Sequence, residues 1–306
     1  MKKAIITGAS GFIGQALTQE LARNKIKVYA IIRNRQSDIT KIEKLSNVTI
    51  VYCDLQHISD IEEIILDRDI DVFFHLAWEG SSGTARTDSV LQLKNVQWAI
   101  DCVNLAKLMN CKKIVCTGSI CEKESIASIN IQGDYLPFSY IYGSAKLTAH
   151  CMCSAVAGNI GIPLLWPIIT NAYGIGEYSP RFINSTIRKM LNKEPLSFTK
   201  ATQNYDFVYI SDIARALFLI GAKGKPFHEY LIGSSHPRPL KDYINIMGSI
   251  INPNQKLKFG DIVFLGKSLP MEAYDCSQIK KDTGFEASIP FAEGIKMTAE
   301  WMKKCY

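Results

Sequence analysis

A tyrosine and a lysine four residues apart are the first candidates for chemistry in this sequence. Tyr142 and Lys146 lie near the start of a predicted helix over residues 139–160, and their spacing places both side chains on one helix face. A free tyrosine has a pKa of about 10 and is a poor base at neutral pH. A nearby cation would favour the tyrosinate, and lowering its pKa by about 3 units requires about 4 kcal/mol. By itself this spacing is common on helices, and a surface pair is the simpler interpretation.

A serine at the end of a predicted strand gives the pair more weight. Ser119 follows Thr117 and Gly118 after the apolar run 113–117, which predicts a strand. Open α/β sheets bind ligands beyond the carboxyl ends of their strands. Ser119, and Thr117 beside it, could therefore hydrogen-bond a substrate oxygen and orient it toward Tyr142. The alternative for Ser119 is a helix cap or a turn residue.

Three glycines follow the first predicted strand, residues 3–7. Gly8, Gly11 and Gly14 have the spacing GxxGxxG and introduce a helical pattern over residues 15–24. In this context glycine permits a tight turn, close approach of a pyrophosphate and close packing of helix on strand. The helix N-terminus offers free N–H groups and the positive end of a dipole to phosphates. The alternative is an ordinary turn between a strand and a helix.

The second predicted strand, residues 27–33, bears on the choice of dinucleotide. An acidic residue at its end would bind the 2′-hydroxyl of NAD, but here the strand ends at Arg33 and Arg35 follows. Both guanidinium groups could pair with a 2′-phosphate, so we predict NADP, with NAD less favoured; the alternative is two exposed arginines. Asp54, after the third strand 48–53, could accept a hydrogen bond from the adenine amino group or cap the next helix.

The elements that position these residues alternate between strands and helices. Strands are predicted over residues 3–7, 27–33, 48–53, 71–75, 113–117 and 163–170, and helices over 15–24, 58–66, 89–109 and 139–160. This order is typical of βαβ units and predicts an α/β fold with a Rossmann-type doubly wound parallel sheet. Pro167 is unfavourable inside the last predicted strand. We assign residues 1–170 to a dinucleotide-binding domain and residues 171–306, where Gly and Pro recur, mostly to a smaller substrate-binding region.

Composition argues against several classes of function. The 306 residues carry a formal net charge of +6 without runs of like charge, which argues against a nucleic-acid partner. No apolar run is long enough to span a membrane, and no signal-peptide pattern precedes the first strand, so we expect a cytoplasmic protein. The nine cysteines form no CxxC pair and no zinc-ligand spacing, which predicts reduced thiols and no metal.

Together these motifs resemble the extended short-chain dehydrogenases/reductases, and among them the NAD(P)-dependent sugar epimerase/dehydratase family. The resemblance covers nearly the whole chain. It rests on residues 7–14 (TGASGFIG), Asp54-Leu55, residues 75–78 (HLAW), Asn95, residues 117–119 (TGS), Tyr142 with Lys146, residues 171–174 (NAYG) and residues 206–212 (DFVYISD). It implies a nicotinamide cofactor, hydride transfer, and a segment around residues 205–235 that returns to the first domain.

The resemblance implies a role for each matching position. Tyr142 would be the acid/base, Lys146 would bind the nicotinamide ribose and tune Tyr142, and Ser119 would polarise the reacting oxygen. The expected cofactor-binding residues are Gly8, Ser10, Gly11, Phe12, Ile13, Gly14, Arg33, Arg35, Asp54, Leu55, Leu76, Ala77, Thr117, Tyr142 and Lys146. The expected substrate-binding residues are Trp78, Ser119, Asn171, Arg181 and Arg238. Trp78 replaces a small residue of the family, and it could narrow the pocket, stack on a sugar ring or pack in the core.

Other positions depart from the family pattern. Family dehydratases carry an Asp-Glu pair after the threonine of the fifth-strand motif, where this chain has Gly118-Ser119, so 4,6-dehydration is disfavoured. Tyr205 and the stretch 269–272 (LPME) stand where many members place arginines that clamp a nucleotide diphosphate. Losing two bidentate clamps weakens diphosphate binding, although Arg181, Arg188 or Arg238 could substitute from other positions.

Three functions therefore stay open. The first is an NAD(P)-dependent oxidoreductase or epimerase that acts on a sugar nucleotide, with Tyr142 as the acid/base. The second is an NADP-dependent reductase of a 4-keto sugar or of a non-nucleotide carbonyl compound. The third is a non-catalytic NADP-binding regulatory module, since a fold does not fix a function. The expected partner is a nucleotide sugar, and the predicted helices 89–109 and 139–160 are candidate surfaces for a homodimer.

Overall fold

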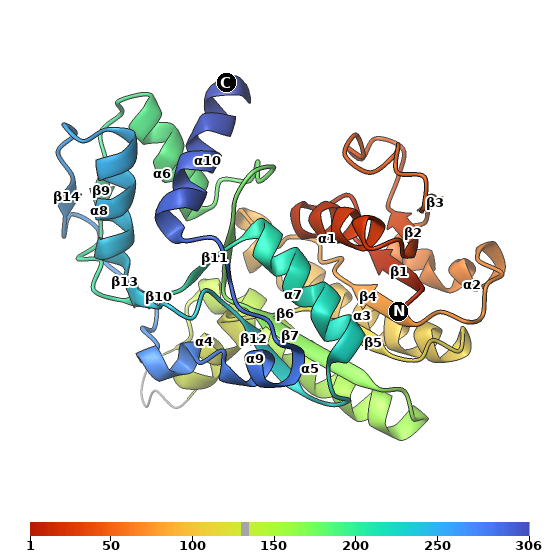
Figure 1. Cartoon of the computed structure of the whole chain (residues 1–306). Coiled ribbons are helices and arrows are strands. Elements are labelled where there is room, and N and C mark those ends of the chain that lie inside the picture. Colours follow the sequence, from red (N-terminus) through yellow and green to blue (C-terminus); the bar gives the residue numbers. More distant parts are fainter. Residues whose placement is uncertain (130–134, 306) are drawn as a thin grey trace.

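The computed structural model describes residues 1–129 and 135–305, and its centre is a parallel sheet (Figure 1). In spatial order the sheet contains β12 (Glu229–Ile232), β7 (Leu164–Ile169), β5 (Ile114–Cys116), β4 (Val72–His75), β1 (Lys3–Thr7), β2 (Lys27–Ile32) and β3 (Val48–Tyr52). A short strand, β6 (Gly118–Ser119), continues the line of β5 and also pairs with β7. Every pair is parallel, so the predicted Rossmann-type α/β fold is confirmed.

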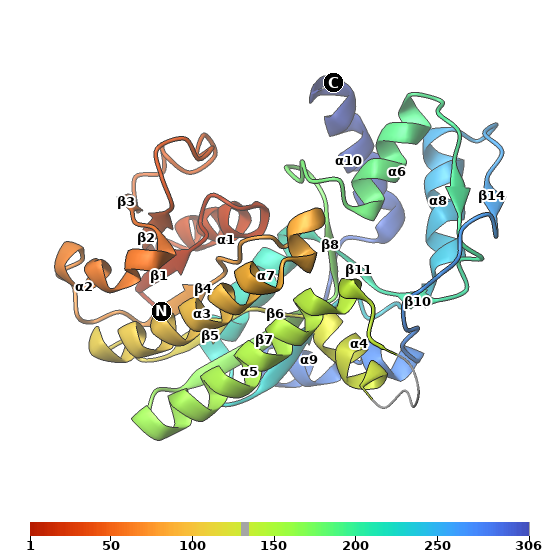
Figure 2. The same ribbon diagram turned by 180° about the vertical axis from the view of Figure 1, so that it is seen from behind.

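Two pairs of long helices cover this sheet. α1 (Phe12–Arg23) and α7 (Ile210–Lys223) lie on one face, and α3 (Ser89–Leu108) and α5 (Ile141–Ile160) lie on the other (Figures 1 and 2). Because both faces are covered, the strands are apolar along their length rather than alternating, and all six residues of β7 are buried. The carboxyl ends of β1, β4, β6 and β7 meet at one edge of the sheet, where the predicted functional residues follow them.

Pro167 occupies the middle of β7 because of a break in the neighbouring strand. The N–H of Trp166 donates to the carbonyl of His228 on the β12 side of β7. Because N–H groups alternate along a strand, the missing N–H of Pro167 would face the other neighbour. There β5 ends at Cys116 and β6 begins at Gly118, so no ladder hydrogen bond is lost. This break also turns the chain so that Ser119 emerges at the sheet edge.

Shorter helices replace some predicted ones. The predicted helix 58–66 is a 3₁₀ helix, η1 (Leu55–Asp60), followed by a single turn, α2 (Ile61–Ile64). The start of the predicted helix 139–160 is another 3₁₀ helix, η3 (Phe138–Tyr140), and α5 begins only at Ile141. Two further short helices contribute to the site, η2 (Thr84–Thr87) and α4 (Cys121–Ser128). The α1 helix starts three residues earlier than predicted, directly after Gly11.

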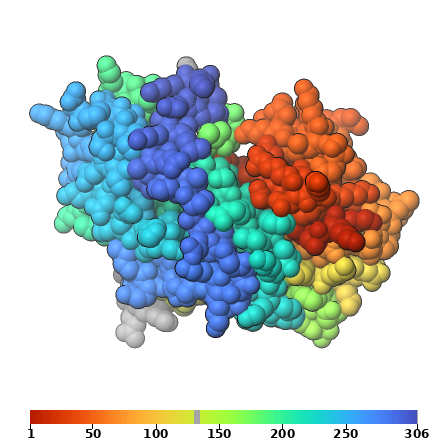
Figure 3. All heavy atoms as spheres, viewed as in Figure 1, coloured from red at the N-terminus to blue at the C-terminus, as the bar shows by residue number. Residues whose placement is uncertain are grey.

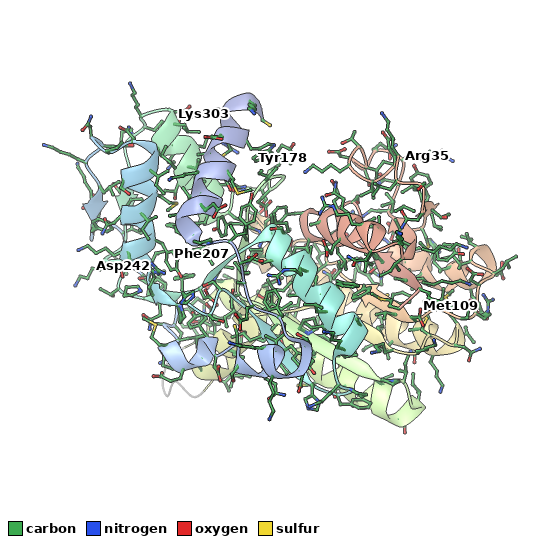
Figure 4. All side chains as sticks on the ribbon, viewed as in Figure 1. Arg35, Met109, Tyr178, Phe207, Asp242 and Lys303 are labelled. Carbon is green, nitrogen blue, oxygen red and sulfur yellow. The ribbon has the colours of Figure 1, made fainter. Side chains whose placement is uncertain are left out.

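The carboxy-terminal part has a hydrophobic core of its own. It is built from α6 (Phe182–Leu191), α8 (Leu240–Ile251) and α10 (Phe291–Cys305) with the short pairs β9 (Ser197–Phe198)/β14 (Lys258–Phe259), β10 (Asn204–Tyr205)/β13 (Arg238–Pro239) and β8 (Asn171–Tyr173)/β11 (Phe207–Tyr209). Phe207 packs against the rings of Tyr173, Tyr243 and Phe291 in this core (Figure 4). In the space-filling view the amino-terminal residues, in red and orange, lie on the right of the molecule, and α8 and α10, in shades of blue, lie toward the left (Figure 3).

The chain crosses between the two parts more than once. After β11 it forms α7, which packs against α1, and then β12, which pairs with β7. Residues 271–283, in η4 (Met271–Tyr274) and α9 (Ser277–Thr283), also lie beside this layer, because α9 contacts α7 and β12. In the described residues no helix is both long and apolar enough to cross a membrane, and no group of three or more His, Cys, Asp or Glu side chains is placed to hold a metal ion.

Candidate active site

The glycine-rich turn between β1 and α1 forms the floor of a first cleft. Gly8 has φ +71°, a left-handed conformation that glycine adopts without strain. A Cβ at Gly14 would overlap the carbonyl oxygen of Gly8, so glycine is what allows α1 to pack this closely on β1. Gly11 caps α1 without a side-chain hydrogen bond. The first N–H groups of α1 are therefore available to an anion in the cleft.

This first cleft has a volume of about 340 Å³ and collects most of the predicted cofactor-binding residues. The predicted residues that line it are Gly8, Ser10, Gly11, Phe12, Ile13, Gly14, Arg33, Asp54, Leu55, Leu76, Ala77 and Thr117, together with Trp78 and Arg181 from the predicted substrate set. A glycine floor, an uncapped helix N-terminus and a flanking arginine fit the pyrophosphate and adenosine of a dinucleotide. Tyr142 and Lys146 do not line this cleft.

The two arginines after β2 have different surroundings. Arg33 lines the first cleft, and its Nη1 lies 3.0 Å from Oε1 of Glu79 in a half-exposed ion pair. Arg35, on the loop after β2, does not line the cleft (Figure 4). Its guanidinium carbon instead lies over the ring of Tyr52, 4.9 Å from the ring centroid. The structure therefore brings Arg33 and not Arg35 to the predicted position. Asp54 lines the cleft, and its side chain also accepts a hydrogen bond from the N–H of Gln56, capping η1.

A second cleft, of about 350 Å³, holds Tyr142 and Ser119. Asn171 and Arg181 also line it, and Arg181 borders both clefts, so the two clefts meet there. The Nη2 of Arg181 lies 3.3 Å from the carbonyl oxygen of Ser81, which ties the loop after β4 to the segment before α6. Three of the five predicted substrate-binding residues thus line the cleft that contains the predicted base.

Arg238 is not brought to either cleft. Its Nε lies 3.5 Å from the carbonyl oxygen of His236, and its guanidinium lies 5.2 Å from the ring centroid of Tyr243. The short β10/β13 pair places Arg238 opposite Tyr205, which lines the second cleft, whereas Arg238 does not. Of the three arginines predicted to replace the missing diphosphate clamps, Arg181, Arg188 and Arg238, only Arg181 lines either cleft.

Burial governs the protonation of Tyr142. The side chain is buried in the first turn of α5, and this burial raises its pKa above 10. The nearby charges of Arg86 and Arg181 and a hydrogen bond with Ser119 act in the opposite direction and lower the pKa. Tyr142 is therefore protonated at neutral pH in the protein alone, and a further positive charge in the site would be needed to make it a base.

Lys146 lies one turn further along α5 and is also buried. Its Nζ donates a hydrogen bond of 2.8 Å to the carbonyl oxygen of Thr117 and lies 3.7 Å from the ring centroid of Trp78. Burial lowers its pKa to about 8. Trp78 in turn meets Tyr142 edge to face at 6.2 Å and donates from Nε1 to Oε1 of Gln92. Trp78 thus lines the first cleft, covers Lys146 with its ring and also packs against the hydrophobic core.

A buried carboxylate behind Ser119 was not anticipated from the sequence. Glu122 is 1% exposed, accepts a 2.8 Å hydrogen bond from the N–H of Ser119 and accepts another from Nε1 of Trp166. Its Oε2 also lies 3.0 Å from Nδ1 of His150, which stacks on Trp166. A Cβ at Gly118 would overlap both Glu122 and the Trp166 ring, so glycine is what allows this cluster to pack against the strand. This cluster fixes the backbone that carries Ser119.

We expect Glu122→Ala to destabilise the protein by about 3 kcal/mol, because it leaves the buried N–H groups of Ser119 and Trp166 without an acceptor. The neighbouring Lys123, which pairs with Glu229 at the surface, provides the control: Lys123→Ala should change stability by less than about 1 kcal/mol. Urea denaturation followed by circular dichroism measures both changes. Equal losses in the two variants would contradict a structural role for the Glu122 cluster.

Comparisons with known proteins place this site in a family. The model of the "NAD dependent epimerase/dehydratase family" matches residues 4–233. The chain belongs to the NAD-dependent epimerase/dehydratase family. The resemblance stated from the sequence motifs is thereby confirmed. A probable dTDP-glucose 4,6-dehydratase of Sinorhizobium fredii is 24% identical over 329 residues, which cover 98% of this chain and 92% of that protein.

Solved structures of the epimerase/dehydratase family have the same fold along the whole chain. A UDP-N-acetylglucosamine 4-epimerase of Methanobrevibacter ruminantium, in complex with UDP-N-acetylmuramic acid, gives a TM-score of 0.81 at 21% identity and covers 100% of this chain and 99% of its own. A dTDP-glucose 4,6-dehydratase of Bacillus anthracis, in complex with NAD, gives 0.82 at 17% identity and covers 99% and 97%. Both epimerases and dehydratases are similar to this chain, so the family alone does not select between these reactions.

Three residues of the second cleft carry no sequence motif. Arg86, in η2, and Cys121 and Glu124, in α4, all line the cleft beside Tyr142. Arg86 belongs to a 3₁₀ turn that follows Gly83, whose φ is +67°. A turn this short leaves no periodic pattern in the sequence. The only available signal for Cys121 and Glu124 was their closeness in sequence to Ser119.

Proposed function

We propose that the protein is an NAD(P)-dependent enzyme that oxidises and reduces a carbinol carbon of a nucleotide sugar, with epimerisation as the favoured outcome. The observation that supports this most directly is the junction of the two clefts at Arg181. One cleft has the glycine floor that suits a dinucleotide, and the other contains Tyr142 and Ser119. A sugar in the second cleft would therefore present its hydroxyl to Tyr142 and its carbon toward the first cleft.

The chemistry divides between the chain and its cofactor. When bound, the nicotinamide supplies a reversible acceptor for hydride. Ser119 donates a hydrogen bond to the reacting sugar oxygen, and Tyr142 takes the hydroxyl proton as the carbon is oxidised. Tyr142 returns that proton when the ketone is reduced. In an epimerase the keto sugar rotates between these two steps. Hydride then returns to the opposite face of the carbonyl carbon, and the same side chains serve the oxygen.

The nucleotide part of the substrate follows from the relatives and from Arg181. The relatives named above are described as acting on dTDP-glucose or UDP-N-acetylglucosamine. In this chain Arg181 is the one predicted substitute for the diphosphate clamps that borders the second cleft, and its Nε lies 3.6 Å from Oε2 of Glu177. A diphosphate would compete with Glu177 for this guanidinium, so we expect weaker nucleotide binding than two free arginines would give.

A second candidate is reduction of a carbonyl compound that carries no nucleotide. Tyr205 lines the second cleft at the position where many family members place an arginine, and Arg238 lies outside both clefts. Protection of the protein from proteolysis by UDP and dTDP separates the two candidates. Protection at millimolar nucleotide supports a nucleotide sugar, and its absence supports the carbonyl reductase.

Two other functions receive less support. Elimination at the 4,6 positions, the reaction named for several relatives, is disfavoured because Gly118-Ser119 stands where dehydratases carry an Asp-Glu pair. A regulatory module without turnover needs no buried acid/base, yet Tyr142, Lys146 and Ser119 are grouped at one sheet edge. The regulatory module predicts no turnover in the wild type that Tyr142→Phe could lower, and this separates it from our proposal.

For the cofactor we propose NADP, with Arg33 as the partner of the 2′-phosphate. Arg33 borders the first cleft, whereas the Bacillus anthracis relative was solved with NAD. Glu79 neutralises Arg33 and would repel a 2′-phosphate, so we expect the preference for NADPH over NADH to be modest. The side chain of Glu79 therefore sets the selectivity that Arg33 makes available.

Accordingly, Glu79→Gln should strengthen NADPH binding about 3- to 10-fold and change NADH binding less than about twofold, since only the 2′-phosphate feels the lost charge. Arg33→Ala should have the opposite effect on NADPH. The exposed Glu286, which pairs with Lys280 outside both clefts, provides the control variant Glu286→Gln. Titration of bound cofactor by fluorescence measures the dissociation constants of NADPH and NADH for the wild type and the three variants. An NADPH affinity that does not respond to Glu79→Gln or Arg33→Ala would argue for NAD.

A further inference from the structure

Arg86 contacts the predicted base directly. Its guanidinium carbon lies 4.2 Å from the ring centroid of Tyr142, so the cation lies over the face of the aromatic ring. Its two terminal nitrogens lie 3.4 Å from the carbonyl oxygen of Ser81 and 3.4 Å from Sγ of Cys121, which hold it there. A cation over an aromatic face is attracted to the ring, and the attraction increases when the ring oxygen loses its proton.

Lys146, the cation that the family pattern assigns to Tyr142, has further contacts of its own. Its Nζ is bonded to the carbonyl of Thr117 and covered by the Trp78 ring. With its pKa lowered to about 8 by burial, a part of the Lys146 population is neutral near physiological pH. A guanidinium does not lose its proton in this range, so Arg86 provides a constant positive charge.

The other charged and polar groups near Tyr142 come from three further segments of the chain. Arg181, from the segment before α6, shares its guanidinium with Ser81 and Glu177. Cys121, from α4, faces Tyr142 and Arg86, and Ser119, from β6, hydrogen-bonds the phenol. Glu124, also from α4, lines the same cleft and faces Arg86. Among the described residues, Arg86 is the cation with a direct contact on the Tyr142 ring.

We infer that Arg86 is a second cation of the chain, beside Lys146, that stabilises the Tyr142 phenolate, and that Arg86 is thus a positioning residue for proton transfer. The inference deepens the proposed function and rests on it for the reaction that Tyr142 serves. The contact between the two side chains does not depend on the substrate, so it can be tested without turnover.

The first test measures the ionisation of Tyr142 in the protein bound to oxidised cofactor. Tyrosines labelled with ¹³C at Cζ are titrated by NMR, and the Tyr142 resonance is assigned by its loss in Tyr142→Phe. We expect Arg86→Met to raise the midpoint by about 1–2 pH units, and Arg86→Lys to restore part of that shift because it keeps the charge. Lys241→Met, which removes a cation from the exposed face of Phe259, is the control and should leave the midpoint unchanged.

Two results of this titration would overturn the inference. One is an equal midpoint in the wild type and in Arg86→Met, both folded by circular dichroism. The other is a wild-type Tyr142 that stays protonated over the whole range in which the protein is folded. Tyr142 could also titrate in the wild type and stay protonated in Arg86→Met up to the pH at which the protein unfolds. The midpoint has then risen at least from its wild-type value to that pH, which supports the inference.

The second test uses turnover and keeps the two proposals apart. In Arg86→Met the acidic limb of the kcat profile should move up by the same 1–2 pH units, with about 10- to 100-fold lower kcat at neutral pH and recovery at alkaline pH. A purely structural role would lower kcat at every pH. Should no nucleotide sugar react, the proposed function fails, while the NMR titration still decides the role of Arg86.

Discussion

Replacing Tyr142 by Phe should lower kcat about a thousandfold and leave cofactor binding within about threefold of the wild type. The phenol is the group in the second cleft that is placed to take and return the sugar proton, and general acid–base groups contribute about 10²- to 10⁴-fold. The substitution removes one oxygen and keeps the ring between Arg86 and Trp78, so the packing is preserved. Steady-state kinetics and a cofactor titration measure the two quantities.

Tyr135→Phe provides the matched control, because that side chain is 88% exposed and removal of its hydroxyl should leave kcat unchanged. A Tyr142→Phe enzyme with more than a tenth of wild-type kcat would contradict the assignment of Tyr142 as the acid/base. It would direct attention to the other groups that can carry a proton in the second cleft, Cys121 and Glu124.

Gly14→Ala should weaken NADPH and NADH binding by at least about 100-fold. The new Cβ would overlap the carbonyl oxygen of Gly8, so α1 must move away from β1 and its N-terminal N–H groups leave their positions at the cleft floor. This loss affects both dinucleotides alike, because the pyrophosphate is common to them. Isothermal titration with each cofactor measures it.

The control for this change is Gly158→Ala in the exposed part of α5, where a Cβ meets nothing within 4 Å. Alanine at that position should leave cofactor binding unchanged and stabilise the helix by about 0.5–1 kcal/mol. Cofactor binding by Gly14→Ala at wild-type strength would mean that the first cleft is not the dinucleotide site.

The sequence was sufficient for the features that depend on local pattern. Gly8, Gly11 and Gly14 predicted the turn because glycines at this spacing allow a helix to start close against a strand. Tyr142 and Lys146 were placed on one helix face by a spacing of four. The parallel Rossmann-type sheet followed from alternating strands and helices, and the family model confirms the resemblance that these motifs indicated.

Contacts between segments that are far apart in the chain could not be predicted from local sequence patterns. Arg86 reaches Tyr142 across 56 residues of chain through an irregular 3₁₀ turn, which leaves no periodic signal. Arg33 was recognised, but its partner Glu79 comes from the loop after another strand, so the competition between the carboxylate and a 2′-phosphate was missed. Arg238 looked available as a charge, whereas the short β10/β13 pair holds it against Tyr243.

Pro167 is a third case, in which the sequence showed a residue that is unfavourable in a strand and the tertiary structure explains why it is tolerated there. Proline lowers the expectation of a strand because it lacks an N–H. In the fold, the gap between β5 and β6 faces that position, and the same gap exposes Ser119. An apparent defect of the predicted strand thus marks the place where the sheet edge forms the site.

The most direct test of the central claim is a single-turnover measurement of nicotinamide reduction. Protein loaded with NADP⁺, and separately with NAD⁺, is mixed with UDP- and dTDP-hexoses, and the absorbance of reduced nicotinamide is followed. Our account predicts a transient signal with at least one sugar nucleotide, lost in Tyr142→Phe and retained in Tyr135→Phe. Tight cofactor binding without reduction by any nucleotide sugar, or an unchanged signal in Tyr142→Phe, would contradict it.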